Sequence, residues 1–202
     1  MTFTVGVTGG IGSGKTAVST RLAGLGASVV DTDEISRALT AAGGAAMPAL
    51  REAFGARYVS PDGALDRAAM RTLAFEDAAA RAKLEAILHP AIRGEADRAL
   101  ARASGPYAVM VVPLLFETGR SAGRVDRILV VDCPEALQLE RAAARSGLAP
   151  DDVRRIMGAQ WPRWRRLQLA DDVIWNGGEL AALDRQCAAL HERYRGEARA
   201  RR

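Results

Sequence analysis

Residues 9–16 read Gly-Gly-Ile-Gly-Ser-Gly-Lys-Thr, and this stretch decides the fold class of the chain. Apolar residues alternate at positions 3, 5 and 7 before it, which predicts a short strand. Apolar residues at helical spacing after it predict a helix whose buried face comprises Val18, Leu22 and Leu25. Between a strand and a helix, glycines let the backbone wrap its N–H groups around a phosphate without obstruction by side chains. We call residues 9–16 the phosphate loop.

The phosphate loop gives its residues specific tasks in binding a nucleotide. Its N–H groups and the positive end of the following helix would hold the phosphates. Lys15 can reach the β- and γ-phosphates, and the hydroxyl of Thr16 can ligate Mg²⁺. The predicted nucleotide-binding residues are Gly10, Ile11, Gly12, Ser13, Gly14, Lys15, Thr16 and Ala17. The alternative is a glycine-rich turn with no ligand, and the strand before it and the helix after it both argue against that alternative.

Several reaction classes share such a loop, and the rest of the sequence narrows them. A GTPase would carry an Asn-Lys-x-Asp motif to read guanine, whereas this chain has a single asparagine, Asn176, followed by glycine. The third predicted strand is followed by Pro113 rather than by a metal-binding aspartate. Asp31 and Asp33, which follow the second predicted strand, are the remaining acidic candidates. We therefore expect an ATP-dependent kinase.

Composition and charge exclude some classes and leave others open. The chain has 202 residues, 49% of them hydrophobic and 26% charged, as expected for one globular domain. Its longest apolar run, at 107–116, is about half of the roughly 20 residues that a membrane-spanning helix needs. No basic and apolar leader precedes the phosphate loop, so we expect a cytoplasmic protein with no membrane partner. The net charge of +4 fits either nucleic acid or substrates that carry several phosphates.

The pattern of apolar residues predicts an α/β fold of the P-loop NTPase class. Further strands are expected at 27–30, 107–112, 127–131 and 173–175, and the helices between them favour a parallel five-stranded sheet in three α/β/α layers. The region from 34 to about 102 shows only helical periodicity, apart from a turn at Ser60-Pro61-Asp62-Gly63. Two more helices are predicted, one starting with Pro134 as its first residue and one at Pro150. The arginine-rich residues 195–202 are expected to be solvated and frayed.

Asp31 and Asp33 lie at the carboxyl end of a predicted strand, where ligands gather in open α/β sheets. A kinase that acts on a hydroxyl needs a carboxylate within hydrogen-bond reach of that hydroxyl, and Asp33, further beyond the strand, is the predicted general base. The alternative is that Asp33 only caps a helix that begins near Glu34. Either aspartate could also join Thr16 in binding Mg²⁺.

Three polar stretches have more than one interpretation. Gln138, Arg141 and Arg145 share one helix face, which predicts either a lid with a guanidinium that closes over the γ-phosphate or an ordinary solvated face. Three arginines and two tryptophans within residues 161–166 could hold a nucleotide or stack on nucleic acid, and we favour the nucleotide. His89-Pro90 falls inside a helical pattern that the proline should kink or break, with the histidine buried.

Motifs spread along the chain narrow the choice of acceptor. They are, in order, Thr8 to Thr16; Asp31-Thr32-Asp33 with Ile35 and Arg37; Asp62-Gly63 with Leu65-Asp66-Arg67; His89-Pro90; Val112-Pro113-Leu114-Leu115-Phe116-Glu117; Gln138 with Arg141; Gln160 with Arg163 and Arg166; and Ala170-Asp171-Asp172-Val173-Ile174 with Asn176 and Gly178. The His-Pro pair and the Pro-Leu-Leu-Phe-Glu strand end are far more specific than the phosphate loop. With these motifs the chain resembles the dephospho-coenzyme A kinase family over nearly its whole length.

The resemblance implies transfer of the γ-phosphate of ATP, with Mg²⁺, to the ribose 3′-hydroxyl of dephospho-coenzyme A. It implies a nucleotide-binding core at 1–33, 103–137 and 168–202, a helical acceptor subdomain at 34–102 and a lid at 138–167. Asp33, Lys15 and Arg141 would be catalytic, and Arg141 and Asn176 would also bind ATP. The acceptor-binding residues would be Thr8, Asp33, Arg37, His89, Pro113 and Leu114.

Two other functions share part of these features. A nucleoside or nucleoside monophosphate kinase would also have the loop, lid and general base, and a nucleic-acid-binding ATPase would use residues 161–166. The resemblance favours the small molecules ATP and dephospho-coenzyme A as partners, no nucleic acid, and a monomer or weak homo-oligomer. Thr16-Ala17 replaces the commoner Ser-Thr and keeps a hydroxyl for the metal, whereas Trp161-Pro162 with Trp164 makes an unusual exit from the lid.

Overall fold

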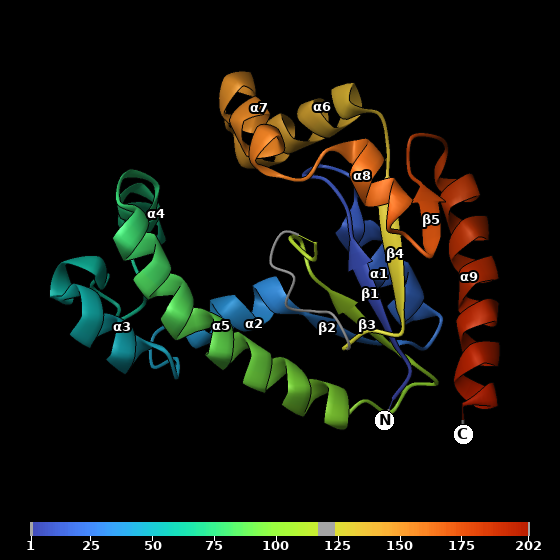
Figure 1. Cartoon of the computed structure of the whole chain (residues 1–202), viewed down its shortest axis with the longest axis horizontal. Helices are drawn as coiled ribbons and strands as arrows, with labels where there is room; N and C mark the ends of the chain where they lie inside the picture. Colours follow the sequence, from blue (N-terminus) through green and yellow to red (C-terminus); the bar gives the residue numbers. More distant parts are fainter. Residues whose placement is uncertain (1, 117–123, 202) are drawn as a thin grey trace. The chain divides into compact units, whose positions relative to one another are not determined.

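The computed structural model of the chain describes residues 2–116 and 124–201. These residues divide into two compact units, and the course of the chain through both is shown in Figure 1. Unit 1 comprises Met1–Val30 and Leu100–Arg202, and unit 2 comprises Asp31–Ala99. Glu117, the last residue of the expected Pro-Leu-Leu-Phe-Glu motif, lies outside the described residues.

Unit 1 is built on the predicted five-stranded parallel sheet, which confirms the α/β fold. Its strands are β1 (Thr4–Thr8), β2 (Ser28–Asp31), β3 (Ala108–Val111), β4 (Arg127–Asp132) and β5 (Asp172–Trp175), in the order β2-β3-β1-β4-β5. The central strand β1 is buried along its whole length, and its Val7 pairs with Val111 on one side and Leu129 on the other. The carboxyl end of β1, where the phosphate loop begins, is therefore held by neighbours on both sides.

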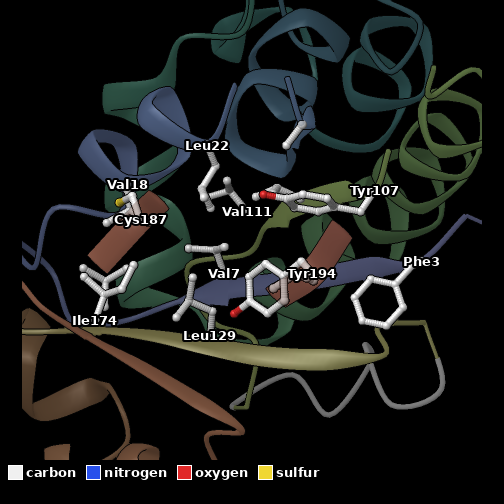
Figure 2. Packing of buried hydrophobic residues seen from close by; sticks show 14 of the residues in the cluster. Phe3, Val7, Val18, Leu22, Tyr107, Val111, Leu129, Ile174, Cys187 and Tyr194 are labelled. Atoms are coloured by element: carbon white, nitrogen blue, oxygen red, sulfur yellow. The ribbon is translucent and has the colours of Figure 1, made fainter. Parts of the chain in front are cut away.

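Two helices far apart in the sequence pack together over one face of this sheet. They are α1 (Lys15–Gly24), which follows the phosphate loop, and α9 (Leu180–Ala200), which runs beside β5. Alternate residues of the strands meet the apolar faces of both helices, and Figure 2 shows Val18 and Leu22 from α1 in one cluster with Tyr194 from α9. Because α1 is fixed in this core, the start of the helix that follows the phosphate loop is fixed as well.

Three shorter helices of unit 1 follow β4 in the chain. They are α6 (Glu135–Ser146), α7 (Pro150–Ala159) and α8 (Arg163–Gln168), and α6 packs on α7. Pro134 precedes α6 as its N-cap and is not its first residue, so that expectation was wrong by one position. The glycine Gly147 ends α6 in the left-handed conformation that a Cβ would disfavour.

Two further expectations for unit 1 were wrong. Leu25 lies beyond the end of α1 and is 43% exposed, because α1 ends at Gly24 and Gly26 turns the chain toward β2 with a positive φ. The arginine-rich end is not frayed, since α9 continues to Ala200 and buries Tyr194 and Ala198. The arginines there occupy the solvated side of a helix whose other side belongs to the core.

Unit 2 is helical, as its periodicity predicts. It contains α2 (Thr32–Leu39), α3 (Met47–Phe54), the 3₁₀ helix η1 (Ala56–Tyr58), α4 (Arg67–Glu76) and most of α5 (Ala78–Ala101). Leu39, Ala46, Met47 and Leu50 form a separate core, against which partly buried residues of α5 pack. The expected turn at 60–63 is closed by the Gly63 N–H, which donates to the Ser60 carbonyl over 2.8 Å, and a bridge pairs Val59 with Leu65.

Pro90 does not break the helix that contains it. The helix α5 is continuous from Ala78 to Ala101 with Pro90 inside it, and His89 is only half-buried. A proline leaves the carbonyl four residues earlier without its helical partner, and here Pro90 and Ala86 are both exposed. Water can satisfy that carbonyl, which explains why the helix tolerates the proline.

Candidate nucleotide-binding site

The phosphate loop contains a tight turn between β1 and α1. The Ser13 N–H donates to the Gly10 carbonyl over 3.1 Å, and Gly12, the third residue of this turn, has a φ of +72°. A positive φ at the third position is what a type II turn requires, and glycine adopts it without strain. The ammonium of Lys15 lies across the loop and donates to the carbonyls of Gly9 and Gly10, over 2.8 and 3.0 Å.

Neighbouring protein groups leave no room for a Cβ at four glycines of the phosphate loop. A Cβ on Gly9 would fall against the Val131 carbonyl, and one on Gly12 would fall against the Gln138 carbonyl. A Cβ on Gly10 would meet the Gln138 side chain, and one on Gly14 would meet the Asn176 amide. Strand β4, helix α6 and the residue after β5 thus enclose the loop so closely that no side chain fits between.

Two amide side chains from distant parts of the chain bind the backbone of the loop. The Ile11 N–H donates to Oε1 of Gln160 over 2.9 Å, and Nδ2 of Asn176 donates to the Ser13 carbonyl over 2.8 Å. Asn176 is buried, and its own carbonyl accepts a bond of 2.9 Å from Arg141. The structure therefore brings Arg141 and Asn176, both predicted to bind ATP, to the phosphate loop. The contact of Gln160 with the loop had no signal in the sequence beyond its place in a motif.

Comparison with known proteins identifies the family of this chain. The sequence model of dephospho-CoA kinase matches residues 3–182. The chain is 57% identical over 198 residues to the dephospho-CoA kinase of Aromatoleum aromaticum, an alignment that covers 98% of this chain and 97% of the relative. It is 56% identical over 190 residues to that of Nitrosospira multiformis, covering 94% and 95%. The chain belongs to the dephospho-CoA kinase family.

Solved structures agree on the fold of this dephospho-CoA kinase family member. TT1252 from Thermus thermophilus is 34% identical to it with a TM-score of 0.83, and the match covers 95% of this chain and 97% of that protein. Dephospho-CoA kinase from Campylobacter jejuni is 23% identical with a TM-score of 0.68, covering 96% and 98%. Shikimate kinase from Bacteroides thetaiotaomicron, at 13% identity and a TM-score of 0.54 with 95% and 98% coverage, shares the fold alone.

The three side chains of the predicted lid face lie in different environments. Gln138 is 1% exposed and donates to the Cys133 carbonyl over 2.9 Å, with its side chain against Gly10. Arg141 is half-buried, and Arg145 is exposed. An ordinary solvated face is therefore wrong for Gln138, whose buried side chain lies against the phosphate loop.

The arginines and tryptophans at 161–166 contact each other and the sheet. Arg163 forms a two-pronged ion pair with the buried Asp132, over 2.8 and 2.7 Å, and this carboxylate raises the pKa of the guanidinium. Arg165 lies 3.8 Å over the ring of Trp161, which also stacks on Phe116 at 5.6 Å between centroids. Trp161 therefore has ring partners inside the protein, and Trp164, 60% exposed, is the tryptophan with most of its surface in solvent.

The predicted general base lies in the first turn of α2, in unit 2. Asp31 is the N-cap of this helix, and its Oδ1 accepts the N–H groups of Asp33 and Glu34 over 2.8 and 3.4 Å. The capping role considered for Asp33 therefore belongs to Asp31, because α2 begins two residues earlier than expected. Asp33 and Arg37 are exposed and lie one helical turn apart.

The remaining predicted residues are distributed over both units. Thr8 is buried at the end of β1, and its hydroxyl donates to the Pro113 carbonyl over 3.3 Å, while Leu114 is 42% exposed. Thr16 is exposed in the first turn of α1, and His89 lies in α5 of unit 2.

Among residues 2–116 and 124–201, no three His, Cys, Asp or Glu side chains are grouped so that they could hold a metal ion. No helix within the same residues is long and apolar enough to cross a membrane.

Proposed function

We propose that the phosphate loop, Arg141 and Asp33 transfer the γ-phosphate of ATP to the ribose 3′-hydroxyl of dephospho-CoA. The products would be coenzyme A and ADP, in the final step of coenzyme A biosynthesis. The observation that carries this proposal is the enclosed turn of the phosphate loop, whose shape is held by Gln138, Gln160 and Asn176. A loop fixed in this way offers N–H groups in the orientation that a phosphate needs, without reorganisation when ATP binds.

Charge neutralisation falls to residues of the loop and its surroundings. Lys15, whose ammonium already bonds to two loop carbonyls, would turn to the β- and γ-phosphates. Arg141 donates to the Asn176 carbonyl through one nitrogen, and its planar fork has further N–H groups for a phosphate oxygen. Both would stabilise the charge on the transferring phosphoryl group.

A magnesium ion fits this donor set as a companion of ATP. Mg²⁺ in such sites takes one or two protein oxygens together with phosphates and water, so a cluster of acidic ligands is not needed. The Thr16 hydroxyl, exposed at the start of α1, would hold it, with Asp31 or Asp33 as a second candidate ligand. When bound, the ion would offset the negative charge of the phosphates.

Asp33 is supported as the base by the role of its neighbour. The Asp31 carboxylate accepts two backbone N–H bonds as the cap of α2, which occupies one of its oxygens and holds the side chain in place. Asp33 lies exposed in the first turn, where its carboxylate can orient the acceptor hydroxyl and take its proton.

The proposed division of labour follows the family. Residues 1–33, 103–137 and 168–202 would bind ATP, 138–167 would act as the lid, and 34–102 would bind dephospho-CoA. The acceptor would be contacted by Thr8, Asp33, Arg37, His89, Pro113 and Leu114. We expect the enzyme to act in the cytoplasm as a monomer or weak homo-oligomer, without nucleic acid.

The test replaces Asp33→Asn, which keeps the size of the side chain and removes the base. We expect kcat with dephospho-CoA to fall about a hundredfold or more, with ATP affinity unchanged. Glu34→Gln, the neighbouring exposed carboxylate on α2, is the matched control and should keep wild-type kcat. An equal loss of ATP affinity in Asp33→Asn would instead make Asp33 a metal ligand. Wild-type turnover of nucleosides in preference to dephospho-CoA would contradict the proposed acceptor.

A further inference from the structure

We infer that Gln160 is a positioning residue for phosphoryl transfer, which acts by fixing the turn at residues 10–13 of the phosphate loop. The expected effect on turnover rests on the proposed function, whereas the expected effect on the loop backbone rests on the structure alone. Oε1 of Gln160 accepts the Ile11 N–H over 2.9 Å, across 149 positions of sequence.

The turn needs such a contact because its own sequence leaves it free to change. Ile11 lies between Gly10 and Gly12, and glycine populates positive and negative φ with similar ease. The Ile11 N–H belongs to the peptide between Gly10 and Ile11, and the carbonyl of this same peptide accepts the Ser13 N–H and the Lys15 ammonium. An acceptor that holds the Ile11 N–H on one side of the loop resists rotation of this peptide, so Gln160 keeps the Gly10 carbonyl in its observed direction.

Gln160 is itself held in place from both directions along the chain. Its N–H donates to the Met157 carbonyl over 3.1 Å at the end of α7. Beyond it, Arg166 donates to the Trp161 carbonyl, and Arg163 is tied to Asp132 at the end of β4. The side chain therefore projects from a short connection that is fastened to the sheet, which makes it a rigid support for the loop.

The direction of loop N–H groups matters more in the transition state than in the ground state. Charge moves within the phosphoryl group during transfer, and donors that are misplaced by about 1 Å can cost up to about a hundredfold in rate. Lys15 bonds to the carbonyls of Gly9 and Gly10, so a rotated turn would also move the acceptors that orient its ammonium. Loss of Gln160 should therefore lower kcat more than it weakens ATP binding.

The experiment compares two substitutions at Gln160 with the same substitution nearby. Gln160→Met keeps the length of the side chain and removes the acceptor, whereas Gln160→Glu keeps an acceptor oxygen. Gln168→Met is the matched control, because Gln168 is exposed at the end of α8. For each protein we would measure kcat, KM for ATP, the melting temperature, and hydrogen exchange of the Ile11 amide by NMR.

Gln160→Met should lower kcat about three- to tenfold, as expected for one neutral hydrogen bond, with KM for ATP changed less than twofold. Its Ile11 amide should exchange faster than in the wild type. Gln160→Glu should restore slow exchange and most of kcat, with a higher KM for ATP from its charge. Gln168→Met should match the wild type in all four measurements.

Two results would overturn the inference: unchanged exchange of the Ile11 amide in Gln160→Met, or a loss of kcat that Gln160→Glu does not restore. A merely structural role would lower the melting temperature and both kinetic constants together in the two Gln160 variants. Failure of the proposed function is seen separately, because the wild type would then not turn over dephospho-CoA. The exchange of the Ile11 amide can be read in either case.

Discussion

The hydrogen bonds that hold the phosphate loop of unit 1 join residues far apart in the sequence, whereas those that begin the helices of unit 2 join near neighbours. Ile11 and Ser13 of the loop are bound by side chains 149 and 163 positions away. In unit 2, the carboxylate of Asp66 accepts the N–H groups of Ala68 and Ala69, two and three positions away, over 3.1 and 3.0 Å. The loop acquires its shape only when distant segments have folded around it, whereas the start of a capped helix is set locally.

The largest expected effect tests why Gly12 is necessary. Either α6 lies too close to the loop for a side chain, or the positive φ of Gly12 disfavours any other residue. Gly12 in unit 1 and Gly63 in unit 2 have similar φ values of +72° and +87°, but a Cβ would meet the Gln138 carbonyl only at Gly12, while Gly63 has open space. Gly12→Ala should lower kcat by more than about a hundredfold, because the turn must move to relieve the clash.

Gly63→Ala is the control for the strain that both glycines share. It should cost about 1 kcal/mol of unfolding free energy and leave kcat within twofold of the wild type. The measurements are steady-state kinetics and urea unfolding of both variants. Equal losses of activity in the two would show that strain, and not contact with α6, makes Gly12 necessary.

The difference between local and distant contacts also explains how much could be predicted from the sequence. The strands, the phosphate loop and α1 follow from alternation and glycine spacing over fewer than about ten residues each, so their prediction needed no knowledge of the fold. The helices of unit 2 were predicted from the same local periodicity. Its role as an acceptor subdomain came only from the resemblance to a family, because helical periodicity carries no information about a ligand.

What the sequence did not reveal depends on contacts made by folding. The sequence places Gln138 on a helix face that fits either a lid or solvent, since spacing along a helix cannot say that the phosphate loop lies against that side. Gln160 was noted only as a member of a motif, and nothing local marks its bond to Ile11. The cap of α2 was assigned to Asp33 as an alternative, whereas Asp31 caps it, an error of two residues that is typical of helix boundaries.

A smaller effect tests whether the caps of unit 2 act locally. Asp66→Ala removes the acceptor for two N–H groups of α4 and should cost about 0.5–2 kcal/mol of stability. Asp66→Ser keeps a capping oxygen and should recover most of that loss. The three tryptophans of the chain, Trp161, Trp164 and Trp175, all lie in unit 1. Circular dichroism should therefore detect the destabilisation at lower urea concentration than tryptophan fluorescence, and coincident shifts would mean that the two units unfold together.

The smallest effect extends the comparison to a long-range contact in the core of unit 1. The hydroxyl of Tyr107 lies 3.0 Å from Nδ1 of His191, and both side chains are buried. Burial lowers the pKa of His191, an effect that Arg195 strengthens and Glu192 opposes. The folded state then binds a proton less readily than the unfolded state, so this histidine contributes a loss of stability as the pH falls below about 6.5, the ordinary value.

Urea unfolding of His191→Gln between pH 7.5 and 5 should show a smaller loss of stability on acidification than the wild type, even if its stability at pH 7.5 is lower. The chain has two histidines, and the other, the half-buried His89 of unit 2, provides the matched control. Measuring His89→Gln beside His191→Gln separates the two histidines, because His89→Gln leaves the buried His191 in place. An unchanged slope in His191→Gln would show that the buried Tyr107–His191 pair does not cause that dependence.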